Sequence, residues 1–288
     1  MPERALSVAA AAIILFTLVA MTAPSWGQPL PNRDDRCDPL WIKPVPAASD
    51  GEVVLPVIVH YMKSTGQTHR GNDVAKVFSQ ALLRRYFDRA QFINGTVWQQ
   101  AKIRLFLHRI EACRYDPAFT GQLPKQPEEI PSPTAGTDGP EMFRRVNDAY
   151  NYQNVRGLDL YLWWEIGGRA VGYARPYHLS GGETTTGAVW VDRQCLETTE
   201  MAKQCPHLIA HEAGHFLGLC HVCKLLGDSQ TKCTSCVPAF DQLPDCSSAK
   251  APKDAIMRSR FDGKKLVNTC EIDRARDEAS SRLGSTSR

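Results

Sequence analysis

Residues 211–221 read HEAGHFLGLCH, a short segment that contains three histidines. His211 and His215 are four residues apart, so on a helix of 3.6 residues per turn they lie on one face, one turn apart. Two imidazoles placed in this way can bind the same Zn²⁺ through their ring nitrogens. The spacing therefore predicts a helix at these residues with a metal site on one face.

The third histidine needs a change of chain direction. His221 follows His215 by six residues, so a continuous helix would point it elsewhere. Gly218 lies between them, and glycine accepts the positive φ that ends a helix sharply. The chain can then turn back towards the metal. Three neutral imidazoles leave a fourth position for water, which is typical of a catalytic zinc site, so we predict one catalytic Zn²⁺ held by these three histidines.

Glu212 follows the first histidine directly, and its side chain can reach the open side of the metal without binding it. A carboxylate in that position can activate a zinc-bound water by taking its proton and can pass that proton to the leaving group. The sequence thus predicts hydrolysis at a zinc site. Two other functions stay open: a zinc-binding interaction protein without turnover, and a disulfide-stapled structural or redox protein.

The first 27 residues predict a signal peptide. An apolar run follows Arg4, and Ser25 and Gly27 are the small residues expected before a cleavage site. Cleavage would leave no stable membrane span and a secreted or periplasmic protein, whereas a retained anchor is the alternative. The formal net charge of +3, without a dense run of Lys and Arg, argues against nucleic acid as a partner.

The remaining patterns predict one α/β (α+β) domain with a twisted mixed sheet. Residues 28–50 indicate an extended leader or short pro-segment, and the domain is expected to span 51–288, with an N-terminal subdomain to about 218 and a mostly irregular, cysteine-rich C-terminal subdomain. The expected strands are 53–59, 102–110, 158–164 and 187–191. The expected helices are 73–91, 141–150, a helix that starts near Pro206 and ends near Gly218, and 269–283.

Ten cysteines, an even number, predict disulfides in an exported chain. Eight of them follow residue 190: Cys195, Cys205, Cys220, Cys223, Cys233, Cys236, Cys246 and Cys270. The two CxxC pairs at 220–223 and 233–236 could instead hold a structural zinc ion, but the predicted export favours disulfides. We expect Cys220 and Cys223 to pair with downstream cysteines and to fix the turn that carries His221.

The segment HEAGHFLGLCH resembles HExxHxxGxxH, the extended zinc motif of the metzincin clan of metallopeptidases. The strand at 53–59, the helix at 73–91 and INGTVWQQAKIRLFL at 93–107 are similar to secreted bacterial and pappalysin-like members, with a reprolysin-like subfamily as the alternative. The resemblance implies a secreted zinc endopeptidase that acts on peptide or protein substrates.

The resemblance also implies roles outside the motif. Metzincins carry a methionine in a tight turn beneath the zinc, and Met257 is the candidate. The run Gly187, Ala188, Val189, Trp190 and Val191 stands where the clan keeps an antiparallel edge strand, which would bind substrate backbone as an added strand. Two positions depart from the clan. Several members have a tyrosine where this chain has Ser259, and Val222 fits none of the common subfamilies.

Two interpretations are open for Cys37. Many metzincins have a pro-segment cysteine that caps the zinc and keeps the zymogen latent, and Arg36-Cys37-Asp38 is a weak match to such a switch. A disulfide between Cys37 and Cys113 is the alternative. We favour the disulfide because it keeps the cysteine count even.

Overall fold

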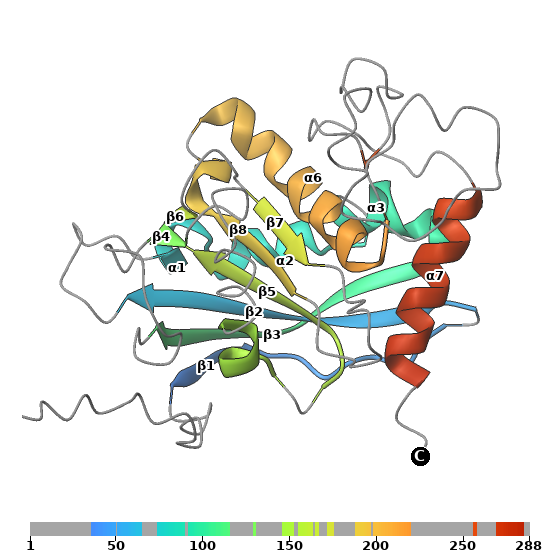
Figure 1. Cartoon of the computed structure of the whole chain (residues 1–288), viewed down its shortest axis with the longest axis horizontal. Helices are drawn as coiled ribbons and strands as arrows, with labels where there is room; N and C mark the ends of the chain where they lie inside the picture. Colours follow the sequence, from blue (N-terminus) through green and yellow to red (C-terminus); the bar gives the residue numbers. More distant parts are fainter. Residues whose placement is uncertain are drawn as a thin grey trace, which may run out of the picture. The chain divides into compact units, whose positions relative to one another are not determined.

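A six-stranded mixed sheet organises the computed structural model of the chain (Figure 1). Its strand order is β1-β3-β2-β5-β8-β7. The strands are β1 Cys37–Ile42, β2 Val53–Ser64, β3 Ile103–Tyr115, β5 Leu158–Trp163, β7 Gly172–Arg175 and β8 Ala188–Asp192. The four inner strands run parallel, whereas β1 and β7 pair antiparallel at the two edges. The predicted α/β domain with a mixed sheet is therefore confirmed.

The structure describes residues 36–49, 51–64, 74–89, 92–115, 129–130, 146–152, 155–163, 165–166, 172–175, 188–196, 198–219, 256–257 and 269–284. All of them belong to one compact unit, Pro31–Arg288. A separate two-stranded parallel pair joins β4 Glu129–Ile130 to β6 Glu165–Ile166. Because β1 is built into the sheet, the folded part begins before residue 51.

Alternation along the strands gives the sheet two buried faces. In β2, Val57 and Val59 point into a core that includes α6 Thr199–Phe216, and we call this side the α6 face. His60 and Met62, at the alternate positions of the same strand, point to the opposite side. A second core there contains Tyr161, Trp190 and residues of the short helix 146–150. We call that side the His60 face. Figure 1 shows α6 and the helix 146–150 on opposite sides of the strands.

The remaining helices pack mainly on the α6 face. They are α1 Val74–Val77, α2 Gln80–Tyr86, α3 Ile93–Thr96, the 3-10 helices η2 Trp98–Ala101 and η3 Arg193–Leu196, and α7 Thr269–Gly284. The single helix predicted at 73–91 is wrong, because the described chain breaks at Phe78 and Ser79. The Ser79 hydroxyl accepts a hydrogen bond from the Leu82 backbone N–H at 3.2 Å and so starts a new helix as its N-cap.

The histidine-bearing helix α6 begins earlier than expected. Thr198 is its N-cap, and its hydroxyl accepts a hydrogen bond from the Met201 backbone N–H at 3.1 Å. Pro206 therefore lies inside the helix, and its predicted place in the first turn is wrong. The cap decides the start because its side chain satisfies a backbone donor that the first turn leaves without a partner.

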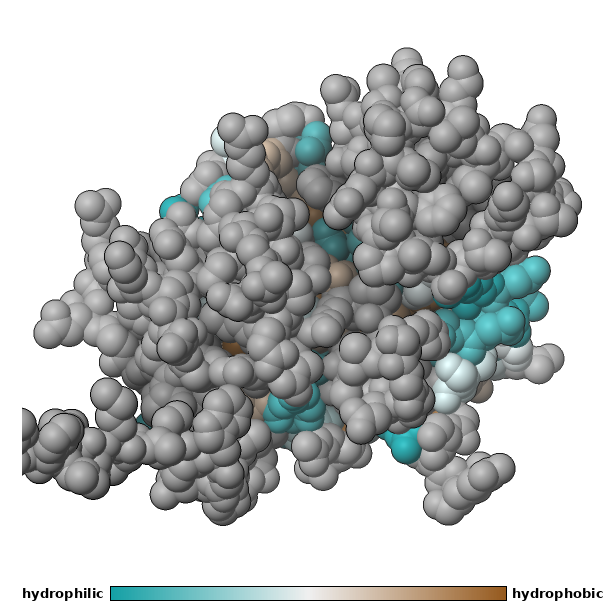
Figure 2. Space-filling view, viewed as in Figure 1, coloured by the Kyte–Doolittle hydropathy of each residue, from teal (hydrophilic) through white to brown (hydrophobic). Residues whose placement is uncertain are grey.

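The predicted last helix is confirmed as α7, and it is amphipathic. Ala275 and Ala279 are buried, whereas Asp273 and Asp277 are exposed. Figure 2 shows hydrophilic residues on the part of the described surface where α7 lies. Among the described residues, no helix is both long and apolar enough to cross a membrane.

Candidate functional site

Helix α6 brings His211 and His215 together as their spacing predicted. The centroids of the two rings are 4.8 Å apart, with the rings nearly perpendicular. His211 is buried and His215 is half-buried. The helix is held in place because Ile209, Ala213 and Phe216 pack into the core of the α6 face. The apolar stripe that anchors the helix thus fixes the direction of the two imidazoles.

Each of the two imidazoles makes one hydrogen bond to a backbone carbonyl through Nδ1. His211 Nδ1 lies 2.6 Å from the Ile256 carbonyl oxygen, and His215 Nδ1 lies 2.8 Å from the Leu219 carbonyl oxygen. A carbonyl can only accept, so Nδ1 is the donor in both rings. In the neutral imidazole this tautomer places the lone pair on Nε2, where it can bind a metal.

Gly218 ends the helix with the predicted positive φ, at +75°. Its N–H donates to the His215 carbonyl at 2.9 Å, and the Leu219 N–H donates to the Gly214 carbonyl at 2.9 Å. The resulting turn also creates the Leu219 carbonyl contact that orients His215. A side chain at Gly218 would crowd Arg274 of α7, because a Cβ there would lie 3.1 Å from its Nε. The predicted third ligand, His221, lies outside the described residues.

The structure places Met257 directly against α6. Met257 is fully buried, and a Cβ built at Gly214 would collide with its sulfur. The preceding residue, Ile256, supplies the carbonyl that holds His211. The turn at 256–257 therefore reaches the helix between the two histidines and sets the tautomer of one of them. The absence of a side chain at Gly214 permits this close approach.

Glu212 is 5% exposed and lies between α6 and the edge strand β7. A Cβ built at Gly172 of β7 would lie 3.2 Å from the Glu212 Cγ and 3.2 Å from its Oε1. Burial raises the pKa of Glu212 to about 8. A buried carboxyl group with a pKa near neutral pH, on the residue next to His211, is suited to transfer a proton in either direction.

The predicted edge strand is wrong. Residues 188–191 do form a strand, β8, but β8 lies between β5 and β7 and pairs with both. At this end of the described sheet, the antiparallel edge strand is β7. The error is understandable because β8 is the more apolar segment, and all its described residues are buried, as expected for a strand with neighbours on both sides.

The described cysteines form two disulfides. Cys37 pairs with Cys113, which confirms the favoured alternative and removes the Cys37 sulfur as a cap for the candidate metal site. Cys195 pairs with Cys205 and links η3 to α6. Of the other predicted cysteines, Cys220, Cys223, Cys233, Cys236 and Cys246 lie outside the described residues, and the side chain of Cys270 is not described.

Asn94 starts the sequon Asn-Gly-Thr but is 1% exposed. Its Nδ2 donates to the carbonyls of Phe87 and Leu105, at 2.9 and 2.8 Å, and its Oδ1 accepts from the Leu105 N–H at 2.8 Å. The side chain joins the α3 region to β3. We therefore expect no glycan at Asn94 in the folded protein.

Sequence reasoning missed a second buried polar cluster, on the His60 face. It contains His60, Glu111 and Asp159. Continuing the alternation of residues 53–59 would have placed residue 60 on the face opposite Val57 and Val59, but the predicted strand 102–110 stopped one residue before Glu111.

No protein-family model and no curated protein matches the chain.

Proposed function

We propose that the chain is an exported zinc endopeptidase of the metzincin type. The observation that carries the proposal is the paired orientation of His211 and His215, whose Nδ1 atoms both donate to backbone carbonyls. Two histidines one helical turn apart, each in the tautomer that has its lone pair on Nε2, form two thirds of a three-histidine zinc site. His221 is the proposed third ligand.

The donor set fits zinc, because imidazole nitrogens held by outer hydrogen bonds are typical of such sites. When bound, Zn²⁺ supplies Lewis-acid polarisation of the scissile carbonyl and lowers the pKa of a water ligand. Glu212 is the proposed general base. It accepts a proton from the attacking water at its carboxylate and donates a proton to the leaving amine, without an acyl-enzyme.

The edge strand β7 is the proposed binding site for the substrate backbone, in place of residues 187–191. It is antiparallel to β8, lies at the edge of the sheet and contacts Glu212 through Gly172. An extended peptide that adds to this edge would place its carbonyl groups close to Glu212. Gly172 has no side chain, which allows Leu208 and the Glu212 carboxyl group of α6 to approach β7 closely.

Export is part of the proposal. The two disulfides fit an oxidising compartment, where such bonds form and persist. The predicted signal peptide at 1–27 lies outside the described residues.

A cleavage assay with paired histidine variants tests the proposal. Purified, zinc-loaded protein is incubated with casein or a peptide library, with and without a chelator. His211→Gln removes a proposed ligand, whereas His207→Gln changes a half-buried histidine one turn earlier on the same helix. We expect cleavage by the wild type and by His207→Gln, and no cleavage by His211→Gln or in the presence of chelator.

The outcome also separates the two rival functions. Zinc bound by the wild type without cleavage of any substrate would indicate a non-catalytic zinc-binding protein. Equal zinc content in the wild type and in His211→Gln would contradict the site itself and would favour a disulfide-stapled structural or redox protein.

A further inference from the structure

His60 lies in β2 with both ring nitrogens held by carboxylates. Nδ1 is 2.7 Å from Glu111 Oε1, and Nε2 is 2.7 Å from Asp159 Oδ1. A carboxylate can only accept, so both nitrogens carry protons and the ring is an imidazolium. Burial by itself lowers the pKa of His60, but the charges of Glu111 and Asp159 and their hydrogen bonds outweigh it and raise the pKa above its ordinary value. The ring also stacks on Tyr161, with centroids 4.5 Å apart.

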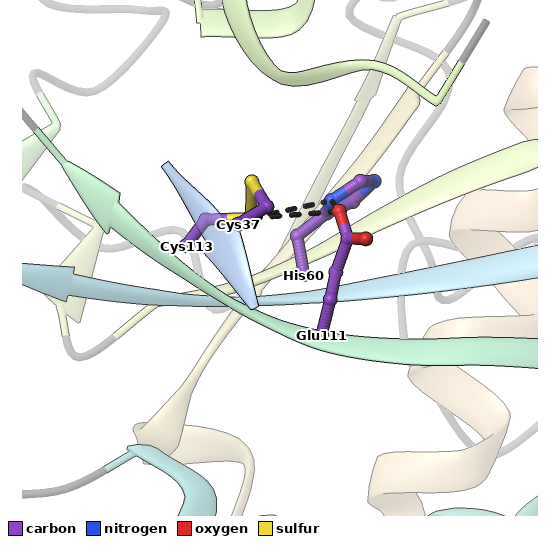
Figure 3. A group of neighbouring side chains, drawn as sticks. All are labelled: Cys37, His60, Glu111 and Cys113. Atoms are coloured by element: carbon purple, nitrogen blue, oxygen red, sulfur yellow. Dashed lines mark hydrogen bonds and ion pairs between the residues drawn. A yellow bond between two sulfur atoms is a disulfide. The ribbon is translucent and has the colours of Figure 1, made fainter. Parts of the chain in front are cut away.

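The Cys37–Cys113 disulfide lies beside this histidine (Figure 3). Cys113 Sγ is 3.7 Å from His60 Nδ1 and 3.5 Å from Glu111 Oε1. Cys37 and Cys113 are directly opposite each other in the antiparallel register of β1 and β3. One ligand atom from each of Cys37, His60, Glu111 and Cys113 lies within 4.8 Å of the others, and all four residues are buried.

These four side chains carry donor atoms of the kinds that Zn²⁺ binds, but the two sulfurs are bonded to each other in the disulfide. Two thiolates, one imidazole and one carboxylate are ligands that Zn²⁺ takes in tetrahedral sites. The outer contacts are already in place. Asp159 accepts from His60 Nε2, which directs Nδ1 inward, and Arg109 Nε holds the other oxygen of Glu111 at 2.7 Å. A carboxylate on the outer nitrogen of a ligating histidine orients the ring and strengthens the ligand.

We propose that Cys37, His60, Glu111 and Cys113 form a closed Zn²⁺ site when the Cys37–Cys113 disulfide is reduced. A dithiol reductant supplies two electrons and two protons, becomes a disulfide itself and leaves two cysteine thiols. Zn²⁺ binding then releases both thiol protons and the Nδ1 proton of His60. The metal link takes the place of the covalent link between β1 and β3. This inference does not depend on the proposed peptidase activity.

The position of β1 gives the reductant and the metal a route. β1 is an edge strand of the described sheet, and Asp38, Pro39 and Leu40 within it are exposed. Edge strands can open locally at a lower free energy than global unfolding. In this proposal, local opening of β1 around the disulfide exposes the sulfurs while the central strands stay in place.

Cobalt binding tests the proposal on the full chain. The protein is reduced with dithiothreitol, desalted without oxygen and titrated with Co²⁺, which gives a charge-transfer band only when thiolates bind it. Reduced wild type is compared with oxidised wild type, with Cys37→Ser/Cys113→Ser and with Cys195→Ser/Cys205→Ser. The last variant is the matched control, because it removes the other described disulfide and leaves the cluster intact.

We expect reduced wild type and the matched control to bind one more metal ion per chain than reduced Cys37→Ser/Cys113→Ser, with a stronger thiolate band. Any metal bound by the remaining cysteines is bound equally by the wild type and by Cys37→Ser/Cys113→Ser. It therefore does not contribute to the difference in metal content between these two proteins. Equal metal content and equal bands in those two proteins would overturn the proposal.

Asp159→Asn provides a second test that keeps every thiol, should the serine variant fail to fold. It removes only the carboxylate behind His60. We expect the Co²⁺ affinity, measured from the thiolate band, to fall about 10–100-fold, while the circular dichroism spectrum stays unchanged. Unchanged affinity in the folded Asp159→Asn protein would contradict the proposed outer contact behind His60 and would count against His60 as a ligand.

Discussion

His211 and His60 are both buried histidines, on opposite faces of one sheet, and their partners differ in kind. His211 Nδ1 contacts the neutral Ile256 carbonyl, whereas both nitrogens of His60 contact carboxylates. A neutral acceptor on one nitrogen favours the neutral ring with a lone pair on the other nitrogen, and two anions favour the imidazolium. His211 is thus in a form that leaves Nε2 with a lone pair, whereas His60, while the Cys37–Cys113 disulfide is intact, has a proton on each ring nitrogen.

The neighbouring carboxyl groups differ in the same way. Burial alone raises the pKa of Glu212. On the His60 face, Glu111 is held by both Arg109 and His60 at 2.7 Å. A buried carboxyl with a raised pKa is typical of a reactive site, whereas a buried carboxylate with paired cations is typical of a structural network. The comparison predicts that variants on the α6 face change activity and those on the His60 face change stability.

The largest expected effect follows from the proposed role of Glu212 as the general base. Glu212→Gln keeps the shape of the side chain and removes the base, so kcat/KM for peptide cleavage should fall about 10²–10⁴-fold while zinc content stays the same. Steady-state kinetics and metal analysis measure both. Glu111→Gln is the matched change on the His60 face, and it should leave kcat/KM unchanged at temperatures where the protein is folded. A similar loss of kcat/KM in both variants would remove the distinction between the faces.

For the free energy of unfolding, we expect the larger loss on the His60 face and the smaller one on the α6 face. His60→Leu leaves Glu111 and Asp159 as buried carboxylates without their shared cation, and we expect the free energy of unfolding to fall by about 3–5 kcal/mol. His211→Leu, measured in metal-free protein, removes the hydrogen bond to the buried Ile256 carbonyl and should cost less, about 1–3 kcal/mol. Urea unfolding monitored by circular dichroism measures both. Equal losses would indicate that the two histidines have equivalent roles in the fold.

The contact between Gly214 and Met257 gives a smaller effect on the α6 face. Gly214→Ala adds a methyl group that collides with the Met257 sulfur, so overpacking should cost about 1–3 kcal/mol. In a Met257→Ala background the methyl group has space, and the cost should shrink. A double-mutant cycle of urea midpoints measures this coupling. Additive effects of the two substitutions would contradict the contact.

The smallest effect concerns alkaline stability and Tyr86, in the core of the α6 face. Burial raises the pKa of Tyr86 to about 12, so the folded state favours the neutral phenol. The unfolded chain ionises near its ordinary pKa of 10, so stability is retained below pH 10 and falls as the pH rises from 10 towards 12. Tyr86→Phe should flatten this decline relative to wild type in the same buffers. An unchanged slope of unfolding free energy against pH would place the alkaline loss elsewhere.

Much of the α6 face could be predicted because its signals are local. The helical spacing of His211 and His215 and the positive φ at Gly218 depend on residues within one or two turns of each other. The helix starts earlier than the sequence predicts from Pro206, because the Thr198 side chain caps it about two turns before that residue. The helix predicted at 73–91 failed for a similar reason, because Ser79 caps a second helix.

The edge strand could not be predicted because strand order is not encoded in the strand itself. Residues 188–191 were recognised as a strand from their apolar run, but only the pairing of β8 with both β5 and β7 makes it internal. The position of β7 against Glu212 depends on the same pairing.

By itself, the sequence determined which side chains share a helix face, where that helix turns and that most apolar segments form strands, because these properties follow from backbone geometry over a few residues. Only the tertiary structure decided the histidine tautomers and the second cluster. The carbonyl that orients His211 comes from 45 residues along the chain, and the carboxylate on His60 Nε2 comes from 99 residues along it. Such contacts form when the sheet brings distant segments together, so no local pattern records them.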